Sequence, residues 1–259
     1  MIITILVSAL ICCLIMLFVW AWAKAIKNAG VVDIFWAFNF SIIAIVICLL
    51  ADGYWERKLI ICGMILVWSM RLGIYLLIRV GSHLQVEEGR YKRLREEWAP
   101  NPDRKFFFFF QSQALSNIYL AIPFFIIAFN KKNEISVLEY VGIAIWAISI
   151  LGEAIADAQL KRFKGKAANK GKVCDAGLWN YSRHPNYFFE SMIWVGYFVF
   201  ALNAPYGWIS ILSPITIILL LFKVTGIPMT EEQAVSSKGD AYKEYQRTTS
   251  VFVPWFKKK

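Results

Sequence analysis

The stretch DAQLKRFKGKAANKGKVCDAGLWNYSRHPNYFFE, residues 157–190, joins two long apolar segments and holds many Lys, Arg, Asn and Tyr residues. A connection between two membrane helices needs only a few residues, because short connections prevail in helical bundles. A polar connection of this length therefore indicates more than a link. We expect it to bind a polar ligand at the ends of the two helices that it joins.

The end of this stretch, GLWNYSRHPNYFFE at residues 177–190, predicts the start of a helix. Pro185 suits the first helical position, where its missing N–H is no loss. A helix that begins there places Asn186 and Glu190 one turn apart on the same face. These two polar side chains are therefore expected to point toward one ligand.

Charged residues precede the predicted helix start. Arg183 and His184 fall beside free backbone N–H groups, a position that favours anions. Upstream, Asp157, Lys161 and Lys164 share one face if the preceding helix continues past the membrane. Two helix ends are thus expected to converge on one anionic ligand.

Apolar runs of about 20 residues, the length that crosses a bilayer, recur on both sides of this stretch. Hydrophobic residues make up 58% of the 259 residues, and the mean hydropathy is +0.52. The pattern predicts an all-α, polytopic membrane protein of about seven transmembrane helices. Pro123 is expected to kink the fourth span. The expected spans cover residues 2–23, 31–51, 59–80, 114–129, 137–156, 187–202 and 208–227.

Most of the 28 Lys and Arg residues fall on one side of a seven-span topology. The positive-inside rule makes that side cytoplasmic, so we expect the N-terminus outside and the C-terminus in the cytoplasm. The chain is then one integral membrane domain, residues 1–259, with cytoplasmic loops at 81–112 and 157–186 and a cytoplasmic tail at 229–259. The net charge of +10 becomes a property of one face, and we expect no nucleic-acid partner.

The five cysteines show no CxxC spacing, so we expect neither disulfides nor a zinc site. The chain also lacks the GxGxxG and GxxxxGK[ST] motifs, which excludes a Rossmann or P-loop nucleotide site. A nucleotide would need a different kind of pocket, formed between membrane helices and their connecting loops.

Ionisable residues within spans indicate function by default. Asp33 opens the second span, where a solvated helix start is an equal alternative. In the third span Trp68, Arg71 and Tyr75 follow a spacing of three and four, so they form one stripe. Arg71 lies near mid-span and needs a partner such as Asp33, a ligand phosphate or a buried carbonyl.

From VDIFW (32–36) to VFVPW (251–255), the chain resembles the bacterial membrane proteins grouped with the steroid 5-alpha-reductase family. Its strongest motif is residues 177–190. The RHPxY element within it also occurs in isoprenylcysteine carboxyl methyltransferases, so the motif identifies the superfamily better than the reaction. The resemblance to the reductases implies a seven-helix protein of the bacterial inner (cell) membrane. Such a protein takes NADPH from the cytoplasm and reduces a C=C bond conjugated to a ketone.

In that family an Asp at the end of the fifth span, an Asn and a Glu after the central loop, and a loop Tyr line the cofactor pocket. NADPH also offers phosphates to cationic side chains. The cofactor-binding residues that we expect are Asp157, Lys161, Lys164, Tyr181, Arg183, His184, Asn186, Tyr187 and Glu190. Simpler roles stay open, since His184 could only cap its helix, and Tyr181 and Tyr187 could belong to an interfacial aromatic belt.

The resemblance implies hydride transfer to the beta carbon while an acid hydrogen-bonds the developing enolate oxygen. The steroid reductases use a Glu in the second span and a Tyr in the third. Asp33 stands where that Glu stands, but Trp68 occupies the Tyr position, and Tyr75 on the same stripe is the candidate replacement. We expect Asp33 and Tyr75 to be catalytic and Trp36, Trp68 and Arg71 to contact the substrate. The substrate is expected to be steroid-like or another isoprenoid or lipid enone.

Two other functions remain possible at this stage. A methyltransferase would place S-adenosylmethionine (SAM) near His184, Tyr187 and Glu232 and act on a lipid-like acceptor, but SAM carries no phosphate for the basic loop. A transporter or scaffold would need more charged residues in its spans than Asp33, Arg71 and Lys223. We expect a monomer that acts on a lipophilic small molecule within the membrane lipid.

Overall fold

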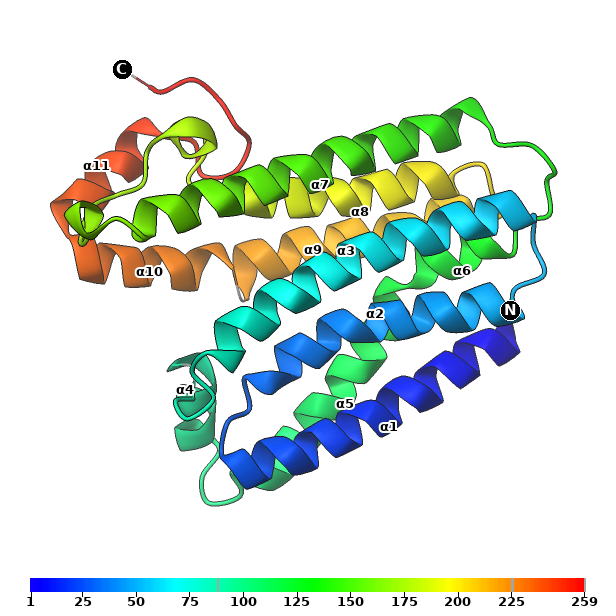
Figure 1. Ribbon diagram of the computed structural model, residues 1–259, viewed down its shortest axis with the longest axis horizontal. Coiled ribbons are helices and arrows are strands. Elements are labelled where there is room, and N and C mark those ends of the chain that lie inside the picture. Colours follow the sequence, from blue (N-terminus) through cyan, green and yellow to red (C-terminus); the bar gives the residue numbers. More distant parts are fainter. Residues whose placement is uncertain (88, 225, 259) are drawn as a thin grey trace. The chain divides into compact units, whose positions relative to one another are not determined.

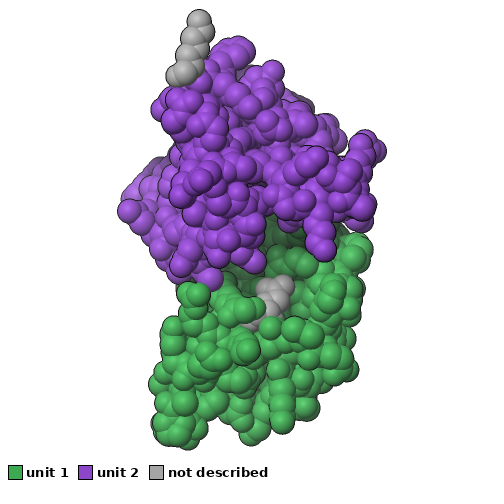
Figure 2. Space-filling model, turned by 90° about the vertical axis from the view of Figure 1, so that its left-hand side faces the viewer, with its two compact units in different colours: residues 1–135, 204–207 green, residues 136–203, 208–259 purple. Residues whose placement is uncertain are grey.

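The computed structural model describes residues 1–87, 89–224 and 226–258, and every regular element in these ranges is helical (Figure 1). This confirms the predicted all-α class. Backbone contacts group the helices into two compact units, coloured separately in Figure 2. Unit 1 comprises Met1–Ile135 and Ala204–Gly207, and unit 2 comprises Ser136–Asn203 and Trp208–Lys259.

In unit 1, α2 packs along α1 on one side and α3 on the other, and α5 packs against both α1 and α2 (Figure 1). α4 contacts α5, and α6 contacts α3. The bounds of these helices are α1 (Ile2–Ile26), α2 (Val31–Leu50), α3 (Trp55–Gly81), α4 (Gly89–Glu97), α5 (Pro102–Leu120) and α6 (Ile122–Ala128).

The core of unit 1 combines aromatic rings with paired polar groups. Phe40 and Trp68 are fully buried and lie edge to face, with 5.0 Å between ring centroids. Asn117 accepts a hydrogen bond from Nδ2 of Asn39 at 3.0 Å and donates one to the carbonyl of Trp36, also at 3.0 Å. Buried amides need such partners, so these bonds tie α2 to α5.

Arg57 holds the start of α3 to the segment that follows α6. Its side chain is fully buried. Nη1 donates to the carbonyls of Asn130 at 3.1 Å and Lys132 at 2.6 Å, and Nη2 donates to the carbonyl of Glu134 at 2.6 Å. A charged donor with several carbonyl acceptors is stable in a buried position, so this arginine has a structural role.

Unit 2 is organised around the antiparallel pair α7 and α8, with α9 beside α8 (Figure 1). Ser136 and Glu139 form a capping box that starts α7. The helices of this unit are α7 (Val137–Lys164), α8 (Pro185–Ala201), α9 (Leu212–Lys223), α10 (Ile227–Lys238) and α11 (Asp240–Thr248). Short 3-10 turns cover Ala167–Asn169, Gly177–Asn180 and Gly207–Ile211.

Two glycines allow α7 and α8 to approach closely. A Cβ atom on Gly142 would lie 2.6 Å from the backbone nitrogen of Phe200, and one on Gly196 would lie 2.9 Å from that of Trp146. Small residues at helix contacts are typical of membrane helix pairs, because they let backbones pack directly. The glycines therefore fix how α7 and α8 lie against each other.

Five helical segments in the described ranges are long and apolar enough to cross a membrane, and the bent pair α5 and α6 would make a sixth. The bend is 40° and lies at the start of α6, where Pro123 occurs, as the sequence predicted. The predicted span at residues 187–202 is α8, whose 17 residues extend about 26 Å, less than the roughly 30 Å of hydrocarbon core. The helices support a multi-pass membrane protein.

The predicted loop at 81–112 is largely helical, because α4 and the first half of α5 lie within it. α5 begins at Pro102, well before the predicted span start at residue 114, since proline favours the first helical turn. The orientation of the termini, the single integral domain and the cytoplasmic side of the loops stay predictions.

Candidate functional site

The second half of α7 carries a stripe of charged side chains. They recur every three or four residues along one unbroken helix, which places them on one face, and they are Glu153, Asp157, Lys161 and Lys164. The helix thus continues as far as the sequence predicted. Glu153 is buried, whereas Lys161 and Lys164 are exposed. The stripe runs from a carboxylate at its buried end to two cations at its exposed end.

α8 meets this stripe in its first turn, and Pro185 begins the helix as predicted. Nδ2 of Asn186 donates a hydrogen bond to Oδ1 of Asp157 at 3.3 Å, so the two helix ends converge as expected. Oδ1 of Asn186 is buried and accepts no hydrogen bond from any group that the structure describes. A buried amide oxygen of this kind suits a donor supplied by a ligand.

Glu190 lies one turn further along α8 and accepts a hydrogen bond from Nε1 of Trp194 at 2.9 Å. A Cβ atom on Gly152 would lie 2.5 Å from the Phe189 ring, so α7 and α8 touch at this level. Glu153 and Glu190 are the next residues along each helix and therefore occupy the same layer of the pair. The candidate site thus combines carboxylates, an amide and two lysines from two helices.

Arg183 is held by the C-terminal part of the chain. Its Nε donates to Oε1 of Glu231 at 2.6 Å, and its Nη1 donates to the carbonyls of Gln246 at 2.9 Å and Thr249 at 2.6 Å. The backbone N–H of Arg183 donates to the carbonyl of Ser250 at 2.8 Å. A phosphate bound by Arg183 would have to compete with these bonds. The structure therefore gives Arg183 a structural role as an alternative to its predicted role in cofactor binding.

His184 takes part in the same cluster. Its side chain is almost fully buried, and Nε2 lies 3.1 Å from Oε1 of Glu231. The ring of Tyr187 stacks on the imidazole with centroids 5.3 Å apart, and the Tyr187 hydroxyl shares a hydrogen bond with Thr230 at 3.3 Å. For the methyltransferase alternative, the sequence suggested that Glu232 lies near the cofactor together with His184. The carboxylate that contacts His184 in the structure is that of the neighbouring Glu231.

The turn before α8 is anchored on both sides. Nε1 of Trp179 donates to the carbonyl of Ala156 on α7 at 2.9 Å. The Tyr245 hydroxyl donates to the carbonyls of Trp179 and Ser182, and burial raises the pKa of Tyr245, which keeps this donor protonated. Tyr181 lies between these anchors and is 41% exposed. A ligand could therefore reach Tyr181 without disturbing the turn.

In unit 1, Asp33 is bonded to a tyrosine that the sequence did not select. The buried Tyr91 hydroxyl donates to Oδ1 of Asp33 at 2.6 Å, and Nη2 of Arg79 lies 3.9 Å from Oδ2. The sequence favoured Tyr75 on α3, which is 43% exposed. Tyr91 belongs to α4, and no periodicity along the chain links α4 to the start of α2.

The predicted substrate residues are distributed over α2 and α3. Nε1 of Trp36 donates to Oγ of Ser116 at 3.0 Å, and its ring lies 5.1 Å from that of Phe40. Trp68 is fully buried on the same phenylalanine. Arg71 is half-buried on α3. Trp36 and Trp68 thus both contact Phe40, Trp36 from a half-buried position and Trp68 from the core, and their contact with a substrate stays a prediction.

The predicted residues divide between the two units. Those for catalysis and substrate belong to unit 1, and those for the cofactor belong to unit 2. Among the residues with described positions, no group of three or more His, Cys, Asp or Glu side chains is placed to hold a metal ion. The five cysteines are free thiols.

Comparison with known proteins adds one match. The protein family described as "Protein of unknown function (DUF1295)" matches residues 19–249, which covers both units. No curated protein and no solved structure matches the chain. A proposal about activity therefore has to start from the residues of the site.

Proposed function

This chain belongs to the DUF1295 family, and from that premise we propose that it is a membrane-embedded reductase. It would transfer hydride from NADPH to the conjugated C=C bond of a lipophilic enone, either steroid-like or another isoprenoid or lipid. The proposal also draws on the resemblance of residues 177–190 to the steroid 5-alpha-reductase family. NADPH supplies the hydride when bound, and the side chains of this chain bind and orient the reactants.

The single observation that carries the proposal is the meeting of α7 and α8 at Asp157 and Asn186. Carboxylates accept hydrogen bonds from ribose hydroxyls, and the buried Oδ1 of Asn186 is an acceptor for a carboxamide N–H. Lys161 and Lys164 lie further along the same face and are exposed, so they suit phosphate groups. The adjoining faces of α7 and α8 would therefore bind the carboxamide, a ribose and the phosphates of one dinucleotide.

Arg183 is assigned a different role from the one that the sequence suggested. Because its guanidinium is bonded to Glu231 and to tail carbonyls, we propose that it positions the loop between α7 and α8. His184 contacts the same Glu231 carboxylate, so we assign it the same positioning role as Arg183. In this proposal the cofactor's phosphates depend on Lys161 and Lys164.

The acid of the reaction is proposed to be the pair Tyr91 and Asp33. The Tyr91 hydroxyl has a single proton, which it donates to Oδ1 of Asp33 at 2.6 Å. If the Asp33 carboxyl is protonated and donates to the Tyr91 oxygen instead, the Tyr91 proton becomes available to hydrogen-bond a developing enolate oxygen. Tyr75 remains the alternative acid. Replacing each tyrosine by Phe separates the two, since only the acid's loss should lower turnover strongly.

The test of the proposal is ligand-dependent thermal stability of the detergent-purified protein. A ligand that binds only the folded state stabilises it, by about 2.7 kcal/mol at 100 times its Kd. We expect NADPH to raise the unfolding midpoint, NADH to raise it less, and SAM to leave it unchanged. A rise with SAM alone would contradict the reductase.

Variants of the site residues test where NADPH binds. Asn186→Ala, Glu190→Ala and the double change Lys161→Ala with Lys164→Ala are each expected to abolish or weaken the NADPH response. Lys243→Ala is the control, because this lysine is exposed and pairs with the exposed Asp240. Asp33→Asn should keep the NADPH response and abolish NADPH oxidation with a panel of enones. An equal loss of the NADPH response in Lys243→Ala would mean that the response depends on the overall positive charge and not on contacts at the site.

A methyltransferase is the second candidate, and one observation favours it. The polar layer of α7 and α8 holds the carboxylates Glu153, Asp157 and Glu190, which suit the sulfonium and amino cations of SAM, while Arg183 is already engaged by Glu231. The acceptor would be a lipid-like or isoprenylated molecule. The same stability measurement separates the two cofactors.

A further inference from the structure

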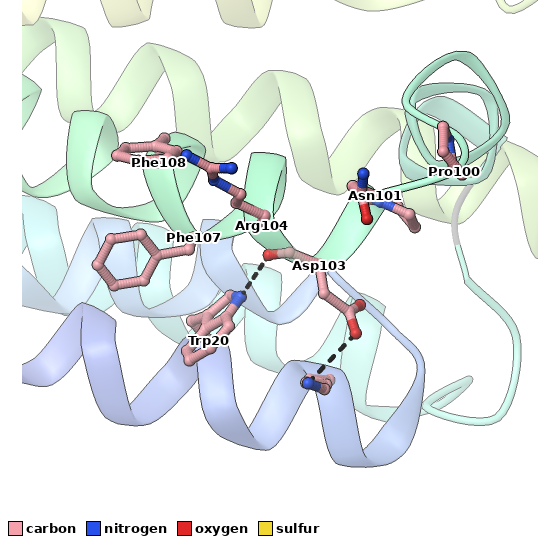
Figure 3. Close-up of a pocket in the computed structure, with 9 residues that line it drawn as sticks. Trp20, Pro100, Asn101, Asp103, Arg104, Phe107 and Phe108 are labelled. Carbon is pink, nitrogen blue, oxygen red and sulfur yellow. Dashed lines mark hydrogen bonds and ion pairs between the residues drawn. The ribbon is translucent and has the colours of Figure 1, made fainter.

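Unit 1 contains a pocket of about 490 Å³ between the end of α1 and the start of α5 (Figure 3). Its volume lies within the range of roughly 300–1,000 Å³ that is usual for ligand sites. The side chains that line it include Trp20, Lys24, Asp103, Arg104, Phe107 and Phe108. None of them belongs to the cofactor or acid sites proposed above.

One wall of the pocket is aromatic. The rings of Trp20 and Phe107 meet edge to face at 5.3 Å. Nε1 of Trp20 donates to the backbone carbonyl of Asp103 at 2.9 Å, which fixes the indole on α5 (Figure 3). Phe108 follows and is 59% exposed. A large exposed apolar ring beside an ordered pocket indicates contact with an apolar ligand or with lipid.

The charges at the pocket leave one cation without an internal counter-ion. Asp103 lies between Lys24 at 3.4 Å and Arg95 at 3.7 Å, so its carboxylate is already balanced. Arg104 is exposed and forms no ion pair within the described ranges. The lining therefore carries a net positive charge that an anion could neutralise.

The pocket lies at the end of a predicted membrane span. Trp20 and Lys24 fall on either side of the predicted span end at residue 23, and tryptophan with basic residues at this depth is typical of the membrane interface. Anionic lipid headgroups are attracted to such clusters. A free phosphate would use Arg104 but not the aromatic wall, whereas a phospholipid would use both.

We propose that this pocket binds an anionic phospholipid. Arg104 and Lys24 hold the phosphate, and Phe107 and Phe108 contact the first carbons of an acyl chain. The bound lipid links the end of α1 to the start of α5 at the membrane surface. This site is independent of the proposed reductase activity.

The test is native mass spectrometry of the full chain in neutral detergent, titrated with phosphatidylglycerol, phosphatidylcholine or glycerol phosphate. We expect phosphatidylglycerol to be retained, phosphatidylcholine to bind about tenfold more weakly, and glycerol phosphate not to compete. An Arg104→Gln change should weaken phosphatidylglycerol binding about tenfold, since a charge-assisted hydrogen bond contributes about 1.5 kcal/mol. Phe108→Ala should weaken both phospholipids.

Lys105→Gln is the matched control, because it removes the same charge from the next residue, which does not line the pocket. Equal weakening by Lys105→Gln and Arg104→Gln would overturn the proposal in favour of diffuse charge attraction. Equal binding of the two phospholipids, or displacement by glycerol phosphate, would also overturn it. Arg104 is exposed, and an unchanged unfolding midpoint without lipid would show that Arg104→Gln is folded.

Discussion

Asn117 in unit 1 and Asn186 in unit 2 carry the same amide group but differ in how fully it is hydrogen-bonded. In unit 1, Asn117 both accepts and donates a hydrogen bond, and Arg57 donates to three carbonyls. In unit 2, Arg183 binds Glu231 on a later helix, while Asn186 keeps a buried oxygen that accepts no described bond. Polar groups with complete bonding hold helices together, and one with incomplete bonding is a candidate for ligand contact.

The largest effect should follow from Arg183→Ala, which would break the link between the α7–α8 connection and the tail. Its loss leaves the largely buried carboxylate of Glu231 without its guanidinium partner, and breaking a buried pair in this way costs about 3–5 kcal/mol. The free energy of unfolding from denaturant titration in detergent measures it. Faster proteolysis of the tail should accompany the loss.

The control for that change is Arg247→Ala in the same tail. Arg247 pairs with Glu244, both are more than half exposed, and exposed pairs contribute about 0–1 kcal/mol. Similar losses from the two variants would mean that the tail is held by general charge. In that case Arg183 would not be a specific link between the α7–α8 connection and the tail.

A smaller loss is expected for Arg57→Ala in unit 1. Three carbonyls lose their charged donor, so the loss should be about 2–3 kcal/mol. Thermal unfolding in detergent measures it, with the exposed Lys131→Ala as a neighbour control. A loss larger than that of Arg183→Ala would reverse the comparison.

Asn117→Ala should destabilise the protein by about 2 kcal/mol, because it leaves the buried Nδ2 of Asn39 without its acceptor and removes the amide's bond to the carbonyl of Trp36. The same denaturant titration gives the value. An Asn117→Asp change keeps the acceptor but places an ionisable carboxyl in a fully buried site, so it should lose at least as much. No change in stability on Asn117→Ala would show that these bonds do not tie α2 to α5.

The smallest effect on stability is expected for Asn186→Ala. The change removes one long hydrogen bond of 3.3 Å together with an oxygen that has no described partner, so the two contributions nearly cancel, within about 0.5 kcal/mol. Asn117→Ala is the same chemical change in unit 1, so the free energies of unfolding of the two variants can be compared directly. A loss as large as that of Asn117→Ala would identify Asn186 as structural.

Local signals predicted much of the fold. Val31 begins α2 and Pro185 begins α8 at the predicted positions, because apolar periodicity and proline act through neighbouring residues. The α7 stripe was also predictable, since its spacing lies within one helix. The start of α5 was placed too late, because the sequence reading began the helix at its apolar run, whereas the helix includes the polar turn at Pro102.

Contacts between distant segments were not predictable in the same way. Tyr91 meets Asp33 across 58 residues, and Arg183 meets Glu231 across 48. Both partners were visible as polar residues in loops or tails, but spacing along a helix cannot pair side chains on different elements. The contact of Tyr91 with Asp33 was missed for this reason, and the catalytic role of Tyr75 stays a prediction.

The sequence by itself determined the all-helical membrane class, the start of α8 and the shared face of Asp157, Lys161 and Lys164. Each of these depends on interactions over a few residues or on the total apolar length of a helix. Only the tertiary structure decided that Arg183 binds the tail, that Tyr91 reaches Asp33, and that Asn186 keeps an acceptor unused. Those outcomes depend on how separate helices pack, which local periodicity does not encode.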